Sequence, residues 1–598
     1  MVALYELVLY DGLTCMNARD SRSDAIISDN MVNKAPMSPF NVEEFRQSAH
    51  QMVEFLADYY RDIESYPVRS QVEPGYLYKQ IPDTAPESPE TLDEVFSDVK
   101  SKILPGITHW LSPQFHAYYP ASFSTAGYLG EMLCGGLNVN GFSWIASPAA
   151  TELEVIVVEW LGKLLNLPKE FLSSGGGGGI IEGTACEAVF VCILAARKRF
   201  VDKYTAEGLL EGEVHSKLVA YTSDQTHSCV AKACKMAGVQ GDNLRILPTD
   251  ASTDFALSPA VLLQAIENDI AAGFIPFFVC GTVGTTSSSA VDPLHAIGDL
   301  AKSFGMWFHI DAAYAGSACI CPEFRPFLDG VEKADSFCLN PHKWLLINFD
   351  SSCLWVKDPK ALESALSTDP EYLKNKHSDE KNVIDFRNLQ LPLSRRFRAV
   401  KLWMVMRMYG ASGLRTHIRN GVRMAKHFES LVKANRHFEI VTPRNFALVC
   451  FRVKPQANDP DNGKTINQKL MDTINANGTV FFTHTVMGGV YTLRMAIGAT
   501  MTQPIHVTDT WAIITTEANR LLGLDSEMCF NSDSGAEMCS SSDNESVDSD
   551  CESTPVLNLS DSEEQPLGAG ALAAAMRPLV ALSASNSFQE RTECIAVA

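Results

Sequence analysis

Apolar residues recur with a helical spacing near the start of the chain and gather into short strand-like runs through its middle. The helical period begins after Asn41 and ends before Pro67, which cannot continue a helix. The stretch 71–89 is rich in proline and is expected to form an extended arm. A helix and an arm without a core of their own are expected to pack on a partner subunit. The periodic positions are Val42, Phe45, Ala49, Met52, Val53, Leu56, Tyr60 and Ile63.

Between about Ala121 and Val356, apolar runs of strand length alternate with helical patterns. This alternation predicts an α/β layer with a largely parallel sheet. The expected strands are 218–222, 275–281, 306–310, 336–339 and 353–356, and the expected helices include 151–166, 183–203, 258–272 and 293–304.

A long helix is predicted after Arg398, followed by a smaller α+β unit with strands near 446–453 and 491–497 and a helix over 466–475. We therefore expect five segments along the chain. They are an irregular extension (1–37), a helical arm (38–120), a large domain (121–397), a small domain (398–524) and a tail (525–598).

Composition narrows the class of protein. The 598 residues exceed one ordinary core, and a hydrophobic content of 46% fits a soluble enzyme. No apolar run has membrane-spanning length, and Met1–Tyr10 lacks the basic start of a signal peptide. The 16 cysteines are scattered without zinc-like pairs, so we expect reduced thiols, a cytoplasmic location and no metal site.

The net charge of −22 is unevenly distributed. Twelve acidic residues and no basic ones lie between Arg520 and Arg577, so the tail is expected to be disordered. Basic residues are nowhere clustered enough to suggest nucleic-acid binding.

Two segments carry the most informative chemistry. Asp311 directly follows the apolar run 306–310, and Lys343 follows the run 336–339. A lone Asp there is usually a turn or cap residue, and a lone Lys is usually solvated. Together, at the carboxyl ends of neighbouring strands, they match what pyridoxal phosphate needs. The lysine forms a Schiff base with the aldehyde, and the carboxylate keeps the pyridine nitrogen protonated.

The glycine run 175–179 leads into a predicted helix, whose N-terminus could bind a phosphate group near Ala185 and Cys186. A flexible linker is the alternative, and a dinucleotide-binding motif is disfavoured because no strand immediately precedes the glycines. His227 follows another strand and could stack on a pyridine ring, although a lone histidine is more often structural. Thr285 and Thr286 add hydroxyls at the same edge.

These motifs resemble the plant aromatic L-amino acid decarboxylases, which include tyrosine/DOPA and tryptophan decarboxylases. This is a group II pyridoxal-phosphate decarboxylase family of fold type I, with a mostly parallel seven-stranded sheet and a small C-terminal α+β domain. The resemblance runs from about Pro39 to Gly523. It includes the motifs Pro105-Gly106-Ile107-Thr108-His109-Trp110, Ser147-Pro148-Ala149-Ala150-Thr151-Glu152-Leu153-Glu154, Asp311-Ala312-Ala313-Tyr314-Ala315-Gly316 and Asn340-Pro341-His342-Lys343-Trp344.

The resemblance implies a homodimer with shared active sites. Lys343 would be the Schiff-base lysine, Asp311 would pair with the pyridine nitrogen and His227 would stack on the ring and take part in catalysis. Phe142 and Ser394 would face the cofactor of the partner. The other implied cofactor-binding residues are Ala185, Cys186, Thr286, Ala313, Asn340 and His342, and the implied substrate pocket is formed by Trp110, Tyr119, Pro120, Phe142, His227, His342 and Ser394.

The resemblance also assigns the general acid. Tyr372, in Asp369-Pro370-Glu371-Tyr372-Leu373-Lys374-Asn375, stands where the family carries its proton donor on a loop. Related aldehyde synthases have phenylalanine there, so Tyr372 favours an amine product. Ser394 stands where tyrosine decarboxylases tend to have serine and tryptophan decarboxylases glycine, which favours tyrosine and DOPA.

Three departures and three alternatives remain open. Leu389 stands where relatives commonly have tryptophan, and Ala121 and Cys186 stand where some have hydroxyl side chains. The alternatives are a tryptophan decarboxylase, an aromatic aldehyde synthase and a non-catalytic scaffold that uses the acidic tail. Intact Lys343, Asp311, His227 and Tyr372 argue against the scaffold.

Overall fold

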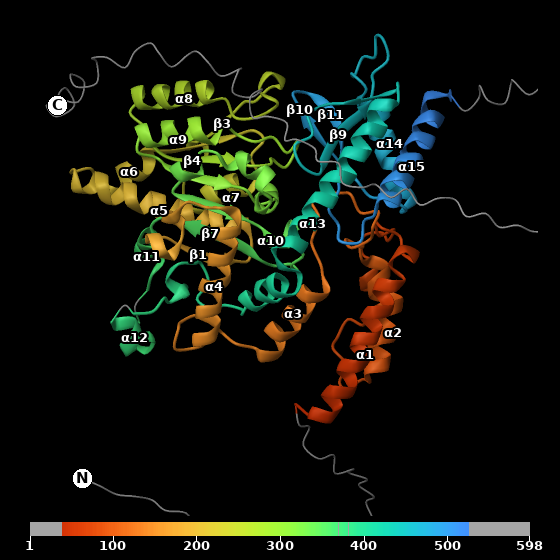
Figure 1. The fold of residues 1–598 in the computed structure, drawn as a ribbon, viewed down its shortest axis with the longest axis horizontal. Helices are drawn as coiled ribbons and strands as arrows, with labels where there is room; N and C mark the ends of the chain where they lie inside the picture. Colours follow the sequence, from red (N-terminus) through yellow and green to blue (C-terminus); the bar gives the residue numbers. More distant parts are fainter. Residues whose placement is uncertain (1–38, 369, 381, 525–598) are drawn as a thin grey trace, which may run out of the picture. The chain divides into compact units, whose positions relative to one another are not determined.

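In a computed structural model of the chain, which describes residues 39–368, 370–380 and 382–524, a seven-stranded sheet is flanked by helices (Figure 1). The strand order is β1-β7-β6-β5-β4-β2-β3, and β7 alone runs antiparallel to its neighbours in this sheet. The predicted, largely parallel α/β layer is confirmed. The strands are β1 Gly178–Glu182, β2 Leu218–Ser223, β3 Leu244–Leu247, β4 Ile275–Thr282, β5 Trp307–Asp311, β6 Ser336–Leu339 and β7 Ser352–Val356.

Helices cover both faces of this sheet, because the side chains of each strand alternate between two cores. In β2, Leu218 and Ala220 pack with α5 and α7, whereas Val219 and Tyr221 pack with α4, α8 and α9. These helices are α4 Pro148–Leu165, α5 Ala185–Ala206, α7 Cys229–Met236, α8 Pro259–Ala271 and α9 Leu294–Ser303.

A second, antiparallel sheet of order β10-β11-β9-β8 lies in the C-terminal part. The long helix α13 contacts α3 and α4 of the first layer as well as β8 and β9 of this sheet. The elements are α13 Ala399–Ala434, β8 Phe438–Ile440, β9 Leu448–Val453, α14 Lys464–Asn477, β10 Thr483–Met487, β11 Val490–Ala496 and α15 Pro504–Leu522.

The N-terminal helix α1, Val42–Arg61, forms where the apolar period predicts it, and Asn41 caps it by accepting hydrogen bonds from Glu43 and Glu44. The stretch 71–89 follows as turns with one short 3-10 helix, Leu77–Lys79. The remaining α-helices are α2 Leu92–Asp98, α3 Thr125–Leu137, α6 Glu211–Lys217, α10 Pro341–Trp344, α11 Pro359–Leu366 and α12 Lys376–Asp379.

No strand immediately precedes the glycine run, as the sequence indicates, because a 3-10 turn, Ser173–Gly175, stands there. Strand β1, which the sequence did not predict, begins within the run at Gly178 and ends at Glu182, shortly before α5 begins at Ala185. Glycine is uncommon in strands, so the run concealed the strand. The structure shows why glycine is needed there. A Cβ at Gly179 would overlap the Cγ1 atom of Val158 on α4, and one at Gly177 would overlap the carbonyl oxygen of Glu170.

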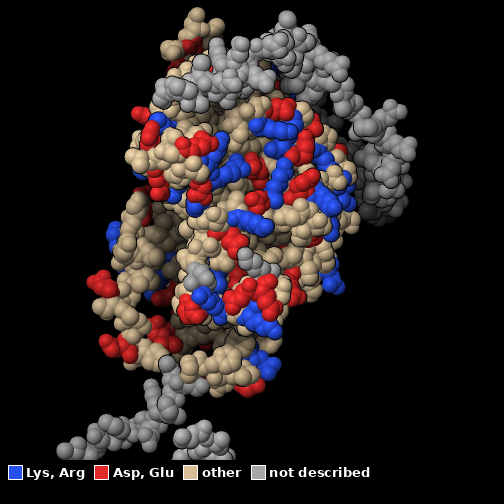
Figure 2. Space-filling model, turned by 90° about the vertical axis from the view of Figure 1, so that its left-hand side faces the viewer, with Lys and Arg blue, Asp and Glu red and all other residues tan. Residues whose placement is uncertain are grey.

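The segments 1–37 and 525–598, expected to be irregular and disordered, lie outside the described residues. Within those that are described, no helix is both long and apolar enough to cross a membrane. The described cysteines are all free thiols. Lys and Arg side chains are interspersed with Asp and Glu over the face shown in Figure 2.

Candidate active site

The carboxyl ends of the parallel strands bring the predicted residues to one edge of the sheet. β5 ends at Asp311, and the adjacent β6 is followed by Asn340 and by helix α10, which carries Lys343. His227 follows β2 at the same edge. This convergence follows from the topology, since parallel strands expose their carboxyl ends together.

A cavity of about 300 Å³ opens at this edge. Ten of the predicted residues line it, together with Thr184, Cys229, Thr282, Gly284 and Tyr314, which were not predicted. The ten are Tyr119, Ala185, Cys186, His227, Thr286, Asp311, Ala313, Asn340, His342 and Lys343.

The electrostatics of the cavity prepare Lys343 for nucleophilic chemistry. Burial lowers the pKa of the Lys343 amine, and the nearby Asp311 carboxylate opposes this effect. A lowered pKa increases the fraction of neutral amine, which is the form that attacks a carbonyl carbon. Asp311 itself is buried, and its Oδ1 atom accepts a hydrogen bond of 2.9 Å from the amide of Ala313.

Two histidines on the cavity wall are held as neutral side chains. The Nδ1 atom of His227 accepts a hydrogen bond of 3.2 Å from the amide of Cys229, which leaves the ring proton on Nε2. Burial lowers the pKa of His227. Burial and the neighbouring Lys343 lower the pKa of His342 to about 3, and its Nδ1 accepts from the amide of Ser351 at 2.9 Å.

The N-terminus of α5 forms another wall of the same cavity. Thr184 caps the helix, with its Oγ1 atom accepting from the amide of Glu187 at 3.4 Å, and Ala185 and Cys186 form the first turn. The unpaired amides and the positive end of the helix dipole suit a phosphate group. The residues predicted to bind the phosphate therefore lie at a strand–helix junction rather than in a flexible linker.

A second cavity of about 880 Å³ adjoins the first and shares Tyr119, His227, Thr286, His342 and Lys343 with it. Its wall is aromatic, because Trp110 stacks on Tyr118 with ring centroids 5.4 Å apart. The predicted Trp110 and Pro120 line this cavity, and so does Ala121.

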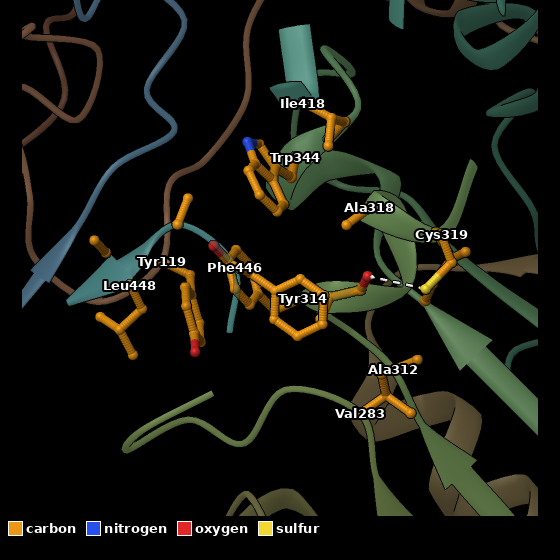
Figure 3. Close-up of a cluster of buried hydrophobic side chains, with 14 of the residues drawn as sticks. Tyr119, Val283, Ala312, Tyr314, Ala318, Cys319, Trp344, Ile418, Phe446 and Leu448 are labelled. Carbon is orange, nitrogen blue, oxygen red and sulfur yellow. Dashed lines mark hydrogen bonds between the residues drawn. The ribbon is translucent and has the colours of Figure 1, made fainter. Parts of the chain in front are cut away.

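Tyr119 is fixed in place by a buried aromatic stack (Figure 3). Its ring lies 3.7 Å from that of Tyr314, which lies 5.0 Å from that of Trp344. The Tyr119 hydroxyl donates to the carbonyl oxygen of Thr285 at 2.8 Å. Tyr314 therefore covers one face of the Tyr119 ring, and the stack fixes the position of Tyr119 in the cavity wall.

Several residues of the larger cavity were not predicted, and they come mainly from the second sheet. Arg494 is 3% exposed and donates to the carbonyl oxygens of Ser287 and Tyr118. Its guanidinium lies 5.4 Å from the centre of the Tyr119 ring. An arginine inside the apolar run 491–497 was the available signal. The others are Tyr118, Ser287, Phe349, Thr483, His484 and Thr485.

Three predicted site residues line neither of these two cavities. Tyr372 is 78% exposed in a 3-10 turn, Glu371–Leu373. Phe142 is half-buried, and Ser394 is exposed and accepts a hydrogen bond of 3.2 Å from the side-chain amide of Asn140. The structure thus brings the segments of Phe142 and Ser394 together, away from the cavities of their own subunit.

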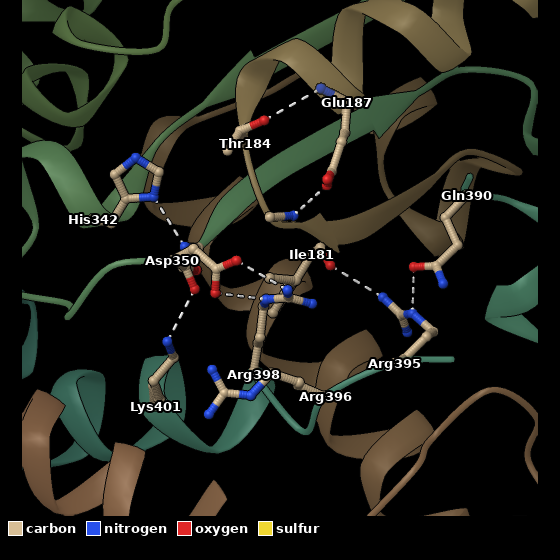
Figure 4. A network of polar contacts seen from close by, with 12 residues as sticks. Ile181, Thr184, Glu187, His342, Asp350, Gln390, Arg395, Arg396, Arg398 and Lys401 are labelled. Atoms are coloured by element: carbon tan, nitrogen blue, oxygen red, sulfur yellow. Dashed lines mark hydrogen bonds and ion pairs between the residues drawn. The ribbon is translucent and has the colours of Figure 1, made fainter. Parts of the chain in front are cut away.

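A buried ionic network fixes the segment that carries Ser394 (Figure 4). Arg395 donates two hydrogen bonds to the Glu154 carboxylate on α4, at 3.0 and 2.7 Å, and a third to the carbonyl oxygen of Ile181 on β1. Arg398 pairs with Asp350 at 3.0 Å. The segment of Ser394 is therefore anchored to α4 and to β1, the strand that precedes α5.

The chain matches a family profile described as the pyridoxal-dependent decarboxylase conserved domain over residues 74–454. It is 54% identical over 486 residues to tyrosine decarboxylase 2 of Narcissus pseudonarcissus, covering 81% of this chain and 96% of that protein. It is 55% identical over 486 residues to phenylacetaldehyde synthase of Arabidopsis thaliana, covering 81% and 98%.

Solved structures give the same result. The Catharanthus roseus tryptophan decarboxylase in complex with L-tryptophan superposes with a TM-score of 0.77 at 51% identity, covering 81% of this chain and 100% of that one. An Oryza sativa TDC with PLP and tryptamine superposes with a TM-score of 0.79 at 45% identity, again covering 81% and 100%. Relatives with three different activities are thus similarly close to this chain.

Proposed function

Because the chain belongs to the pyridoxal-dependent decarboxylase family, within its aromatic amino acid branch, we propose that it converts tyrosine and DOPA to tyramine and dopamine with release of carbon dioxide. Membership of the family does not by itself decide which amino acid is the substrate or whether the product is an amine or an aldehyde. The proposal is carried by the presence of Tyr372 and Ser394 at their positions in the sequence, together with the predicted residues that gather around Lys343 in the smaller cavity.

The residues of the smaller cavity fit pyridoxal phosphate. Lys343 would hold its aldehyde carbon, Asp311 its ring nitrogen and the first turn of α5 its phosphate, with His227 against the ring. When bound, the cofactor supplies an electron-accepting ring that weakens the bond between Cα and the carboxylate of the substrate.

The larger cavity would bind the aromatic side chain of the substrate. Trp110 and Tyr119 offer flat apolar faces, and the aromatic stack behind Tyr119 keeps that wall from collapsing. A lining of this kind also excludes water from the reacting carbon. Arg494 is occupied with carbonyl oxygens, so we assign it the role of holding Tyr118 and Tyr119 in place.

Tyr372 decides the product in this proposal. Its hydroxyl would donate a proton to Cα after carboxylate loss, which yields the amine. Without that proton, the electrons pass to dioxygen. Amino acid, dioxygen and water then give arylacetaldehyde, carbon dioxide, ammonia and hydrogen peroxide.

Replacing Tyr372 with phenylalanine tests this role. The variant should still consume tyrosine, but its product should change from tyramine to 4-hydroxyphenylacetaldehyde with one equivalent of peroxide. Tyr78, 90% exposed and far along the chain from the loop, provides the matched control as Tyr78→Phe. An amine product from Tyr372→Phe would remove Tyr372 from the mechanism.

Ser394 supports tyrosine and DOPA as substrates rather than tryptophan. A serine adds volume and a hydroxyl relative to glycine, which disfavours an indole ring and can serve a phenol. Ser394→Gly should therefore raise kcat/KM for tryptophan relative to tyrosine. A tryptophan preference in the wild-type enzyme would instead identify a tryptamine-forming enzyme, which is the alternative substrate assignment.

A homodimer with shared active sites completes the proposal. Tyr372, Phe142 and Ser394 lie outside the cavities of their own subunit, as expected for residues that serve the partner. Large apolar side chains are exposed along α1 and α3, including Phe45, Met52, Leu133 and Leu137. Surfaces of this kind are typical of subunit interfaces. The free cysteines are consistent with a cytoplasmic location.

A further inference from the structure

The loop that carries Tyr372 has little packing of its own. None of the described residues from 370 to 380 is buried. Leu373, Lys374, Ser378 and Asp379 instead border a cavity of about 950 Å³ that separates the loop from β1 and α4. The position of Tyr372 therefore depends on specific contacts rather than on a packed core.

A buried carboxylate, Asp385, provides such a contact. Its Oδ2 atom accepts a hydrogen bond of 2.7 Å from the Ser378 hydroxyl on the loop helix α12. Ser378 in turn accepts a hydrogen bond of 2.8 Å from the side-chain amide of Asn375, which caps that helix. The chain of hydrogen bonds thus runs from the turn after Tyr372 to a side chain that is 8% exposed.

The same carboxylate holds the segment of Phe142. The Oδ1 atom of Asp385 accepts a hydrogen bond of 3.0 Å from the amide of Trp144. The amide of Arg387, two residues after Asp385, donates a hydrogen bond of 3.1 Å to the carbonyl oxygen of Phe142. The Trp144 ring also meets the ring of His377 on the loop, with centroids 4.8 Å apart.

We propose that Asp385 is a positioning residue that sets the place of both Tyr372 and Phe142, and thereby the division of product between amine and aldehyde. The inference rests on the proposed role of Tyr372. A carboxylate is suited to this task because hydrogen bonds to a charged acceptor are roughly twice as strong as those between neutral groups. Asp385 also joins two segments that are far apart in the sequence and are both assigned to the partner's site.

Three variants test the proposal in the holoenzyme. Ser378→Ala removes the loop contact and leaves the bond to Trp144, whereas Asp385→Asn weakens both. Asp379→Asn changes an exposed carboxylate on the same helix and is the control. Ser378→Ala and Asp385→Asn should raise the ratio of aldehyde to amine by about tenfold, the factor expected for losing one hydrogen bond to a charged group. Asp379→Asn should keep the wild-type ratio.

Limited proteolysis gives a second readout that does not involve turnover. Trypsin should cut after the exposed Lys374 and Lys376 about tenfold faster in Ser378→Ala than in wild type or Asp379→Asn. If Ser378→Ala matches wild type in both product ratio and cleavage rate, the positioning role is wrong, even where Asp385→Asn fails to fold. If Tyr372→Phe still makes amine, Tyr372 is not the general acid. Faster cleavage of Ser378→Ala in that case would still show that the hydrogen bond from Ser378 to Asp385 positions the loop.

Discussion

At the scale of single residues, the chemistry of the site could be predicted because each group follows an apolar run. Asp311 and Lys343 stand at strand ends, and the sheet brings them to one cavity. The aromatic stack of Tyr119, Tyr314 and Trp344 joins segments that are distant in the sequence, so no local pattern indicates it.

Lys343→Ala should abolish turnover and the visible absorbance of bound cofactor, because the variant loses the amine that holds the aldehyde carbon. The absorbance spectrum of the purified protein measures this directly, with circular dichroism as a check of the fold. Lys333 lies just before β6 and outside both cavities, so Lys333→Ala should keep the wild-type spectrum. A turnover number near wild type in Lys343→Ala would contradict the cofactor assignment.

Glu182, at the end of β1, is a buried carboxyl group that the sequence did not single out. Burial raises the pKa of Glu182 to about 8, Glu187 and Glu154 add to this effect, and Arg395 and Arg398 oppose it. Among the described residues, none donates a hydrogen bond to its Oε1 atom. A pKa of about 8 favours the protonated form of Glu182 at neutral pH, next to the first turn of α5.

The raised pKa predicts a pH dependence of stability. The contribution of Glu182 is fully present below its ordinary pKa of 4.5 and is lost as the pH rises through about 8. Glu182→Gln cannot ionise, so it should lose less stability than wild type between pH 5 and pH 8.5. Thermal melts across this range measure the difference, and Glu267→Gln on the exposed side of α8 should follow wild type. Parallel curves for Glu182→Gln and wild type would contradict this account.

At the scale of elements, strands rich in apolar residues were predicted well and glycine-rich or short ones were missed. β6 forms over Ser336–Leu339 as predicted, whereas β1, β3, β8 and β10 were not identified. β1 needs its glycines because α4 approaches closely, and β10 is a half-exposed edge strand. Tertiary contact, rather than local preference, decides such segments.

The buried pair of Glu154 and Arg395 joins α4 and β1 to the segment of Ser394, so breaking it should affect all three. Arg395→Met leaves Glu154 uncompensated and should lower the free energy of unfolding by ~3–5 kcal/mol. The double variant Glu154→Leu/Arg395→Met should recover part of this loss, since no buried charge is left unpaired. Denaturant titration of both variants measures the difference. Equal losses in the single and double variants would show that the charge pair is not the cause.

At the scale of the whole molecule, the homodimer was expected only from the resemblance to the decarboxylase family. The described subunit adds exposed apolar surfaces that suit a subunit interface. Leu133 and Leu137 are 42% and 56% exposed on α3, next to the segment of Phe142. The spacing of apolar residues in the sequence does not predict that these leucines are exposed, because leucines with the same spacing could equally lie in a buried core.

Leu133→Asp/Leu137→Asp should produce monomers with little activity, because charged residues disfavour an apolar interface and, in the proposed dimer, the partner supplies Tyr372. Light scattering coupled to size exclusion measures the mass, and turnover is measured on the same fractions. Leu210→Asp replaces a leucine that is 77% exposed after α5, and it should remain dimeric and active. A fully active monomer would rule out shared sites.

Removing residues 525–598 should leave activity and assembly unchanged. The relatives compared above match 486 residues of this chain over 96% and 98% of their own lengths. The segment 525–564 has low hydrophobicity and a concentrated negative charge, a composition that does not favour packing into an apolar core. Turnover and mass of the truncated protein provide the measurement, and loss of either would assign the tail a structural role.

The most direct measurement is a full product balance of the purified wild-type enzyme with tyrosine, DOPA, phenylalanine and tryptophan. Amine, carbon dioxide, aldehyde and hydrogen peroxide are quantified in the same reaction. We expect equal amounts of amine and carbon dioxide, peroxide near background and the highest kcat/KM for tyrosine or DOPA. Aldehyde and peroxide formed in equal amount to carbon dioxide would contradict it.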